Sequence, residues 1–179
     1  KEKAIFQLIL DQANIPLDSQ LSFSLSIDDP LGKSVDLISY NEYFGWYYVT
    51  FFADQMMIAE GTLRKLMFEV MPNIKISSSF NKPIHISEFG AGAKFGNHTN
   101  KIWSEQYQAK LYEHQLEMLL NNPQIQGISP WVFKDFRAML RPLPGIQDFY
   151  NRKGLIDENG NRKEAFEVLA DFYENKWGK

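Results

Sequence analysis

The sequence lacks cysteine altogether: none occurs among its 179 residues. This absence excludes disulfide bridges, thiolate metal sites and cysteine nucleophiles, but it leaves the compartment open. The bacterial cytoplasm and the periplasm both fit. No apolar run approaches the roughly 20 residues of a bilayer span, and the N-terminus does not resemble a signal peptide. We therefore expect a soluble chain with no membrane partner. It starts at Lys1 rather than Met, which we interpret as a processed chain or a piece of a longer one.

The sequence also lacks a basic stripe. Its 19 Lys and Arg residues are scattered and are outnumbered by 22 Asp and Glu residues, so a nucleic acid partner is not expected. The three histidines, at positions 85, 98 and 114, have no recognisable metal-ligand spacing, and no motif indicates a cofactor. With 44% hydrophobic residues, the chain is long enough for one packed core and too short for two ordinary domains. We expect a single domain over residues 1–179.

Short β-rich segments alternate with helical ones along the chain. Strands are predicted over 21–27, 35–43, 83–89 and 125–133, and helices over 1–13, 53–70, 104–120 and 163–176, with Ser104 as an N-cap. This alternation predicts an α/β fold with a parallel sheet, either doubly wound or a (β/α) barrel. Four strands make up about half of a barrel that normally needs about 250 residues.

The segment "PIHISEFGAGAKFG", residues 83–96, joins a strand to three glycines, Gly90, Gly92 and Gly96. A dinucleotide fingerprint needs G-x-G-x-x-G with a helix starting at once, so that the phosphates meet the helix N-terminus. Here the last glycine is one residue too far, and the next helical pattern begins about eight residues beyond it. The Glu88 carboxylate would also repel phosphates. The glycines therefore do not indicate a nucleotide site.

Glu88 lies at the C-terminal end of its strand, where enzymes with parallel sheets place reactive groups. Strict alternation puts Ile84, Ile86 and Glu88 on one face, while Tyr43 and Trp131 end the neighbouring strands. A carboxylate beside a phenol and an indole suits a sugar, because pyranose C–H faces stack on aromatic rings and hydroxyls bind polar groups. The alternative is a Glu that merely caps a loop.

Five motifs in order carry a family resemblance: "NEYFGWYY", "PIHISEFGAGA", "WSEQYQAKLYEHQ", "GISPWVFKDFR" and "NRKGLIDENGNRKEAFEVL". They resemble the C-terminal half of the catalytic barrel of glycoside hydrolase family 2, which includes β-glucuronidases and β-galactosidases. The resemblance covers nearly all of residues 35–175. It implies a retaining β-glycosidase that hydrolyses β-glucuronides or β-galactosides. It also implies a (β/α)8 TIM barrel, of which this chain would hold strands five to eight with their helices.

The resemblance further implies roles for single residues. Glu88 would be the nucleophile and Tyr43 its hydrogen-bond partner. Asn151 and Lys153 match the Asn-x-Lys pattern with which β-glucuronidases meet the C6 carboxylate of the substrate, although similar runs occur in relatives that act on neutral sugars, and the segment could simply be a loop. Other substrate-binding positions are implied at Asn41, at Trp46 or Tyr47, and at Trp131.

The second catalytic carboxyl is the difficulty. A retaining glycosidase uses two carboxyls about 5–5.5 Å apart. In the family the acid/base is a Glu that follows Asn and usually precedes Pro, whereas the only such pair here, Asn41-Glu42, is followed by Tyr43. Alternation points Glu42 away from Tyr43, so we interpret it as a wall or outward residue. We conclude that the acid/base is missing and that the isolated chain is inactive.

Two functions stay open on this evidence. The chain is either the nucleophile half of a β-glycosidase, completed by the N-terminal half of the barrel and β-sandwich domains, or a non-catalytic carbohydrate-binding or assembly fragment. The open sheet edge of a half barrel favours a homo-oligomer. Among lesser candidates, His98 would line the pocket or be a solvated loop residue, and His85 would face the helix layer. Asp135 and Arg137 would form an ion pair at the rim.

Overall fold

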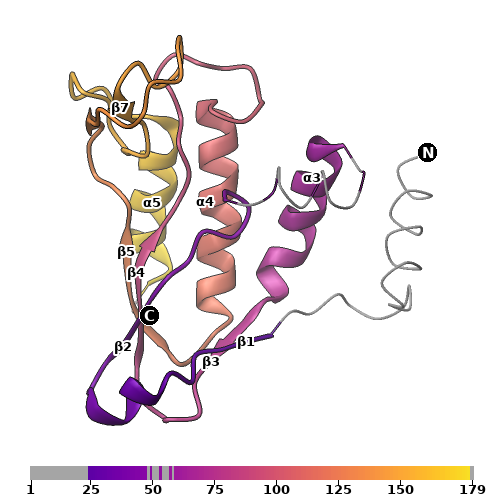
Figure 1. Ribbon diagram of the computed structural model, residues 1–179, viewed down its shortest axis with the longest axis vertical. Helices are drawn as coiled ribbons and strands as arrows, with labels where there is room; N and C mark the ends of the chain where they lie inside the picture. Colours follow the sequence, from indigo (N-terminus) through magenta and orange to yellow (C-terminus); the bar gives the residue numbers. More distant parts are fainter. Residues whose placement is uncertain (1–23, 48, 50–52, 54–56, 58, 178–179) are drawn as a thin grey trace.

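The structure, a computed structural model, describes residues 24–47, 49, 53, 57 and 59–177 (Figure 1). The helix predicted over 1–13 and the first residues of the strand predicted over 21–27 lie outside this part of the chain. In Figure 1 the helices α4 and α5 run alongside the strands β4 and β5, and α3 stands on the far side of α4. The arrangement is therefore a mixed α/β one, with helices packed along strands.

The central sheet has three strands in the order β2-β4-β5, and all three are parallel. They are β2 (Ile38–Asn41), β4 (Ile84–Phe89) and β5 (Ile125–Pro130). The parallel pairing agrees with the prediction, and each strand is shorter than predicted. Because these strands are parallel, their carboxyl ends lie at one edge of the sheet.

A second parallel sheet pairs β1 (Ser24–Ser26) with β3 (Lys75–Ser77). Alternation missed β3, which is only three residues long. The parallel strands thus form two sheets instead of the one continuous set of four expected. The fold is consistent with part of a TIM-barrel-like fold, while a complete four-unit half barrel goes beyond what is observed.

Three helices, α3 (Glu60–Val70), α4 (Glu105–Leu120) and α5 (Glu164–Asn175), are described, together with the 3-10 turns η1 (Pro30–Ser34) and η2 (Met71–Asn73). The predicted N-cap of α4 is confirmed, because the Ser104 hydroxyl accepts a hydrogen bond from the Tyr107 N–H at 3.1 Å. Within the described residues, no helix combines the length and the apolar character that crossing a bilayer requires. A two-stranded antiparallel ribbon, β6 (Phe136–Arg137) with β7 (Tyr150–Asn151), follows the central sheet.

The main core lies between the central sheet and α4. Ile84, Ile86 and Phe89 of β4 are fully buried in one cluster with Leu111 and Tyr112 of α4. The rings of Phe89 and Tyr112 lie 5.3 Å apart. This packing fixes which face of β4 meets the helix layer.

The alternation of β4 breaks before the strand ends, and this break corrects two predictions. Ile84 and Ile86 pack in the core but Glu88 does not, because the register shifts between Ile86 and Phe89 and an irregularity of this kind re-aims the side chains that follow it. His85 was expected to face the helix layer. It lies instead on the opposite face, where its Nε2 is 2.9 Å from the Ser129 hydroxyl.

A buried ionic network holds the loops at the carboxyl edge of the sheet. Lys163 donates to both Asp135 carboxylate oxygens, at 2.8 and 2.9 Å, and to the Ala93 carbonyl at 2.7 Å. Arg152 contacts the same carboxylate at 3.3 Å. The expected pairing of Asp135 with Arg137 is wrong, because the Arg137 guanidinium stacks over a tyrosine ring instead.

Burial acts on both partners of this network. Asp135 is 2% exposed and Lys163 is 1% exposed. Desolvation raises the pKa of Asp135 and lowers that of Lys163, while the attraction between the two opposes both changes. Gly154 closes the network, since its N–H donates to Asp135 at 2.8 Å and a Cβ there would lie 2.3 Å from the Asp135 nitrogen.

Removing one member of the buried pair should therefore be costly. We expect Lys163→Met to lower the free energy of unfolding by about 3–5 kcal/mol, because Asp135 keeps its charge in a buried place without its main partner. The matched control is Lys176→Met, which removes a lysine that is 59% exposed and 3.8 Å from Asp171, and should cost less than about 1 kcal/mol. Urea unfolding of the three proteins measures both values, and equal losses would contradict the assignment.

Candidate active site

Tyr43 and Glu88 meet at the carboxyl edge of the central sheet. The Tyr43 hydroxyl donates to Glu88 Oε2 at 2.8 Å, and the backbone N–H of Glu42 donates to the Glu88 carbonyl at 2.7 Å. On the other side of β4, the Trp131 N–H donates to the Phe89 carbonyl at 2.9 Å. The side-chain pair expected from neighbouring strand ends is thus formed.

The Tyr43 hydroxyl is a dedicated donor. Burial raises its pKa well above the ordinary value, and the hydrogen bond to Glu88 raises it further. A phenol that stays protonated can only give its hydrogen to a carboxylate. Tyr43 therefore holds one Glu88 oxygen by a charge-assisted hydrogen bond, in one direction, across the pH range in which proteins work.

Lys153 is a buried cation within an aromatic wall. It is 4% exposed, and its Nζ donates to the Tyr47 hydroxyl at 2.6 Å. The same atom lies 4.8 Å from the Tyr47 ring, 5.6 Å from the Tyr43 ring and 5.9 Å from the Trp46 ring. Aromatic faces attract cations, but they do not replace an anion as a hydrogen-bond acceptor. Within the described residues Lys153 forms no ion pair with a carboxylate.

Two asparagines flank these groups. The side-chain oxygen of Asn151 accepts from the Lys153 N–H at 3.1 Å, which fixes the backbone that carries the lysine. Asn41 is paired in register with Glu88, and its side-chain oxygen accepts from the Ser87 hydroxyl at 2.7 Å. Trp131, half-buried at the end of β5, packs edge-on against Phe136 at 6.4 Å and is followed by a cis peptide bond. These placements bring polar and aromatic groups to the rim that carries Glu88.

Comparison with known proteins shows which proteins this chain resembles in sequence and fold. No protein-family model matches the chain. β-Glucuronidase of Rattus norvegicus is 28% identical over 145 residues, which are 78% of this chain and 20% of that enzyme. The crystal structure of a glycoside hydrolase family 2 β-galacturonidase from Eisenbergiella tayi is 29% identical with a TM-score of 0.56, over 78% of this chain and 23% of that one. The chain is related to glycoside hydrolase family 2.

The family 2 relationship covers a fragment. β-Glucuronidase of Faecalibacterium prausnitzii matches 97% of this chain with a TM-score of 0.58, but at 21% identity it supports the fold alone. This chain spans 28% of that structure. It likewise spans between 8% and 29% of three curated relatives that it matches. The relatives are therefore larger proteins, of which this chain corresponds to one part.

His98 contacts the beginnings of two helices. His98 is expected either to line the pocket or to be a solvated loop residue, and its nitrogens contact Gln106 at 2.7 Å, Glu164 at 3.3 Å and Glu105 at 3.8 Å. These residues belong to the first turns of α4 and α5. The structure thus brings Tyr43, Glu88, Tyr47 and Lys153 together. A role of His98 in binding stays a prediction.

The glycines after Glu88 serve packing. Gly90 has a φ of +127°, and a Cβ on it would lie 2.6 Å from the Tyr112 hydroxyl. A Cβ on Gly92 would lie 2.5 Å from the ring of Trp103. The loop can follow β4 this closely only without side chains at these two positions. This explains the glycines without a phosphate ligand.

Sequence reasoning missed the support beneath the aromatic wall. The Tyr107 hydroxyl donates to the Gly45 carbonyl at 2.7 Å, and Arg64 Nη1 donates to the same carbonyl at 3.1 Å and to Tyr107 at 2.8 Å. Trp46 packs edge-on against Trp103 at 4.9 Å. The available signal was a hydroxyl-bearing aromatic residue in the first turn of α4, on the face that the helix buries.

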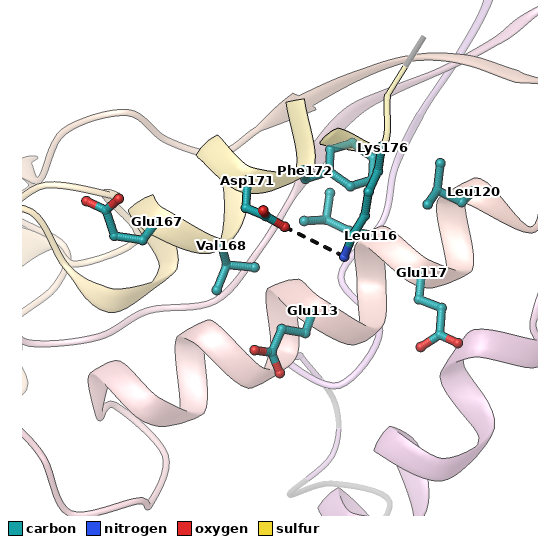
Figure 2. A pocket seen from close by; sticks show the side chains of 9 residues that line it. All are labelled: Glu113, Leu116, Glu117, Leu120, Glu167, Val168, Asp171, Phe172 and Lys176. Carbon is teal, nitrogen blue, oxygen red and sulfur yellow. Dashed lines mark ion pairs between the residues drawn. The ribbon is translucent and has the colours of Figure 1, made fainter. Parts of the chain in front are cut away.

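A groove of about 560 Å³ between α4 and α5 is separate from this site (Figure 2). Leu116 and Phe172 lie at its floor, and carboxylates from both helices surround it. All its lining residues come from position 113 onward on α4 and from 167 onward on α5 or just after it. Glu88 lies at the opposite end, where these helices begin.

The packing role of Gly90 can be measured. We expect Gly90→Ala to cost about 1–3 kcal/mol more unfolding free energy than Gly96→Ala, because the φ of Gly90 is less accessible to alanine than that of Gly96 and only the first substitution adds a clash. At Gly96, with φ +79°, the added methyl meets no described atom within 4 Å. Urea unfolding compares the two variants. If they lose the same stability, the loop yields and Tyr112 does not constrain it.

Proposed function

We propose that this chain carries the nucleophile half of a retaining β-glycosidase, with Glu88 as the nucleophile. The observation that carries the proposal is the Tyr43 hydrogen bond to Glu88 at the carboxyl edge of parallel strands. The relationship to family 2 enzymes supports the same reaction class. The second candidate is a non-catalytic carbohydrate-binding or assembly fragment, which the aromatic wall would also suit.

In the proposed reaction, a Glu88 oxygen attacks the anomeric carbon of the sugar. A glycosyl ester forms as the bond from that carbon to the aglycone oxygen breaks, and an acid protonates the departing oxygen. Tyr43 holds the attacking carboxylate in one orientation by its hydrogen bond. Water then attacks the anomeric carbon, the ester bond breaks, and the same second carboxyl, now a base, takes the water proton.

The second carboxyl would come from outside this chain. Glu42 is next to Tyr43 in sequence, but its carboxyl is 1% exposed and faces Gln115 of α4. A group enclosed between sheet and helix cannot reach a leaving oxygen on the open side. We therefore assign the acid/base to the remainder of the protein, which would also complete the barrel. Self-association of the isolated chain stays a prediction.

For the substrate we propose a uronide, which Lys153 and Asn151 would recognise. Lys153 offers ammonium hydrogens beside Tyr43 and Tyr47 without an anionic partner in the described residues. A sugar carboxylate would supply that partner, and burial would strengthen the pairing. The names of the relatives, a β-glucuronidase and a β-galacturonidase, agree with an acidic sugar.

Substrate preference tests this assignment in the complete enzyme. Lys153→Ala should raise the barrier for an aryl β-glucuronide by about 2–5 kcal/mol through loss of the carboxylate's partner, and it should leave an aryl β-galactoside nearly unchanged. The control is Lys101→Ala, which removes an exposed lysine from the loop before α4. Equal losses on both substrates would make Lys153 a structural residue.

The isolated chain tests the nucleophile. Without the acid, an alkyl β-glucuronide should react about 10²–10⁴-fold more slowly than in the complete enzyme. An aryl glucuronide with a good leaving group needs no proton, so it should form a slowly hydrolysed ester on Glu88. Peptide mass spectrometry locates the ester, and Glu88→Gln should abolish it. Binding of the sugar without any ester would favour the non-catalytic candidate, and rapid alkyl turnover would mean that the chain contains its acid.

A further inference from the structure

Glu42 is a buried carboxyl joined to both halves of the Tyr43–Glu88 pair. It precedes Tyr43 in the chain, and its backbone N–H donates to the Glu88 carbonyl at 2.7 Å. Its side chain, 1% exposed, turns to the helix side of the sheet, where Oε1 accepts from the Phe44 N–H and, at 3.4 Å, from Gln115 Nε2. The carboxyl thus ties the turn that carries Tyr43 to helix α4.

The other oxygen of this carboxyl has no partner. Glu42 Oε2 is buried without a hydrogen bond, and so is Oε1 of Gln115, whose amide nitrogen bonds the same carboxyl. Two buried acceptors on neighbouring groups cannot satisfy each other while Glu42 is ionised. A proton on Oε2 would convert one of these two acceptors into a donor.

No cation compensates a charge on Glu42 among the described residues. The groups that interact with it are neutral: Tyr40 of β2 and Gln115 of α4. Arg64, a buried cation of α3, binds the Gly45 carbonyl, Tyr107 and Glu60 instead. Burial raises the pKa of Glu42 to about 8, although the hydrogen bonds from Phe44 and Gln115 lower it. Burial and the lack of a compensating cation therefore favour the neutral carboxyl.

We propose that Glu42 is a positioning residue, which holds the turn of Tyr43 against Glu88 as a neutral acid. The inference rests on the proposed function of Glu88 for its catalytic meaning. Ionisation would leave an unpaired charge between the sheet and α4, and the turn would have to open to hydrate it. The Tyr43 hydrogen bond to Glu88 would then loosen together with the fold.

The linkage has a definite sign. Because the folded-state pKa is raised from 4.5 to about 8, the stability that protonated Glu42 contributes is fully present below 4.5 and is lost as the pH rises towards 8. Within that window the folding equilibrium constant of the natural chain should fall about tenfold per pH unit relative to a chain without this proton. Glu42→Gln resembles the neutral acid in shape and should remove this dependence.

Stability of the 179-residue chain tests the proton without any activity. Urea unfolding from about pH 5 to pH 9 compares the natural chain with Glu42→Gln and with Glu117→Gln, an exposed carboxyl of α4. We expect the unfolding midpoint of the natural chain and of Glu117→Gln to fall with rising pH relative to that of Glu42→Gln. Parallel curves for all three proteins would overturn the neutral acid, whatever the chain's function.

Activity of the complete enzyme tests the positioning. We expect Glu42→Gln to keep kcat at pH 7 within about twofold and to retain activity at alkaline pH where the natural enzyme declines, while Glu42→Ala loses at least about tenfold at all pH values. Equal losses in Glu42→Gln and Glu42→Ala at pH 7 would show that an ionised carboxylate is required and would overturn the proposal. An unchanged alkaline limb in Glu42→Gln would also overturn it. An inactive natural enzyme would refute the proposed function alone, because the unfolding curves still decide the state of Glu42.

Discussion

The arrangement at the rim of the sheet depends on the buried pair of Asp135 and Lys163. Lys163 immediately precedes α5, Asp135 lies in the loop after β5, and the Ala93 carbonyl that Lys163 also bonds belongs to the glycine loop after β4. One ammonium group therefore joins three segments that are far apart in the sequence. Arg152 adds a fourth, because it contacts Asp135 and Glu158 from the segment that holds Asn151 and Lys153. In that segment two consecutive residues have different partners. Arg152 binds Asp135 of the ionic network, while Lys153 packs among the rings of the aromatic wall.

The sequence predicted the features that follow from local pattern and from the geometry of parallel sheets. Ser104 caps α4 because a serine hydroxyl can accept from the first turn, and Tyr43 reaches Glu88 because neighbouring parallel strands end at one edge. The irregularity between Ile86 and Phe89 was not predictable from alternation, because alternation assumes an unbroken period of two. The partner of Asp135 could not be predicted either, since Lys163 lies 28 residues away and Arg137 is nearer in the chain.

Two carboxyls at adjacent strand ends illustrate how surroundings set chemistry. Glu88 receives the hydrogen of a tyrosine that cannot readily lose it, and this hydrogen bond fixes the orientation of the carboxyl. Glu42 faces the helix layer, where burial without a cation favours the neutral acid. The two side chains are of the same type but point in different directions. The irregularity in β4 turns Glu88 out of the core, while Glu42 lies buried between the sheet and α4. Divergent environments for paired carboxyls are a recurring basis for distinct roles.

The aromatic wall and the ionic network together explain how a lysine without an anion is tolerated. Burying an ammonium group is unfavourable, and contacts with three rings and one hydroxyl offset only part of that cost. The position persists because the backbone around Lys153 is fixed independently, by Asn151, by Gly154 and by the pairing of Arg152 with Asp135. A group held in place by its surroundings does not have to be ordered when a ligand arrives, so an incoming carboxylate would gain its interaction without a further entropic cost. Selectivity for an acidic sugar would then depend on Asp135 and Lys163, two residues that need not touch the sugar.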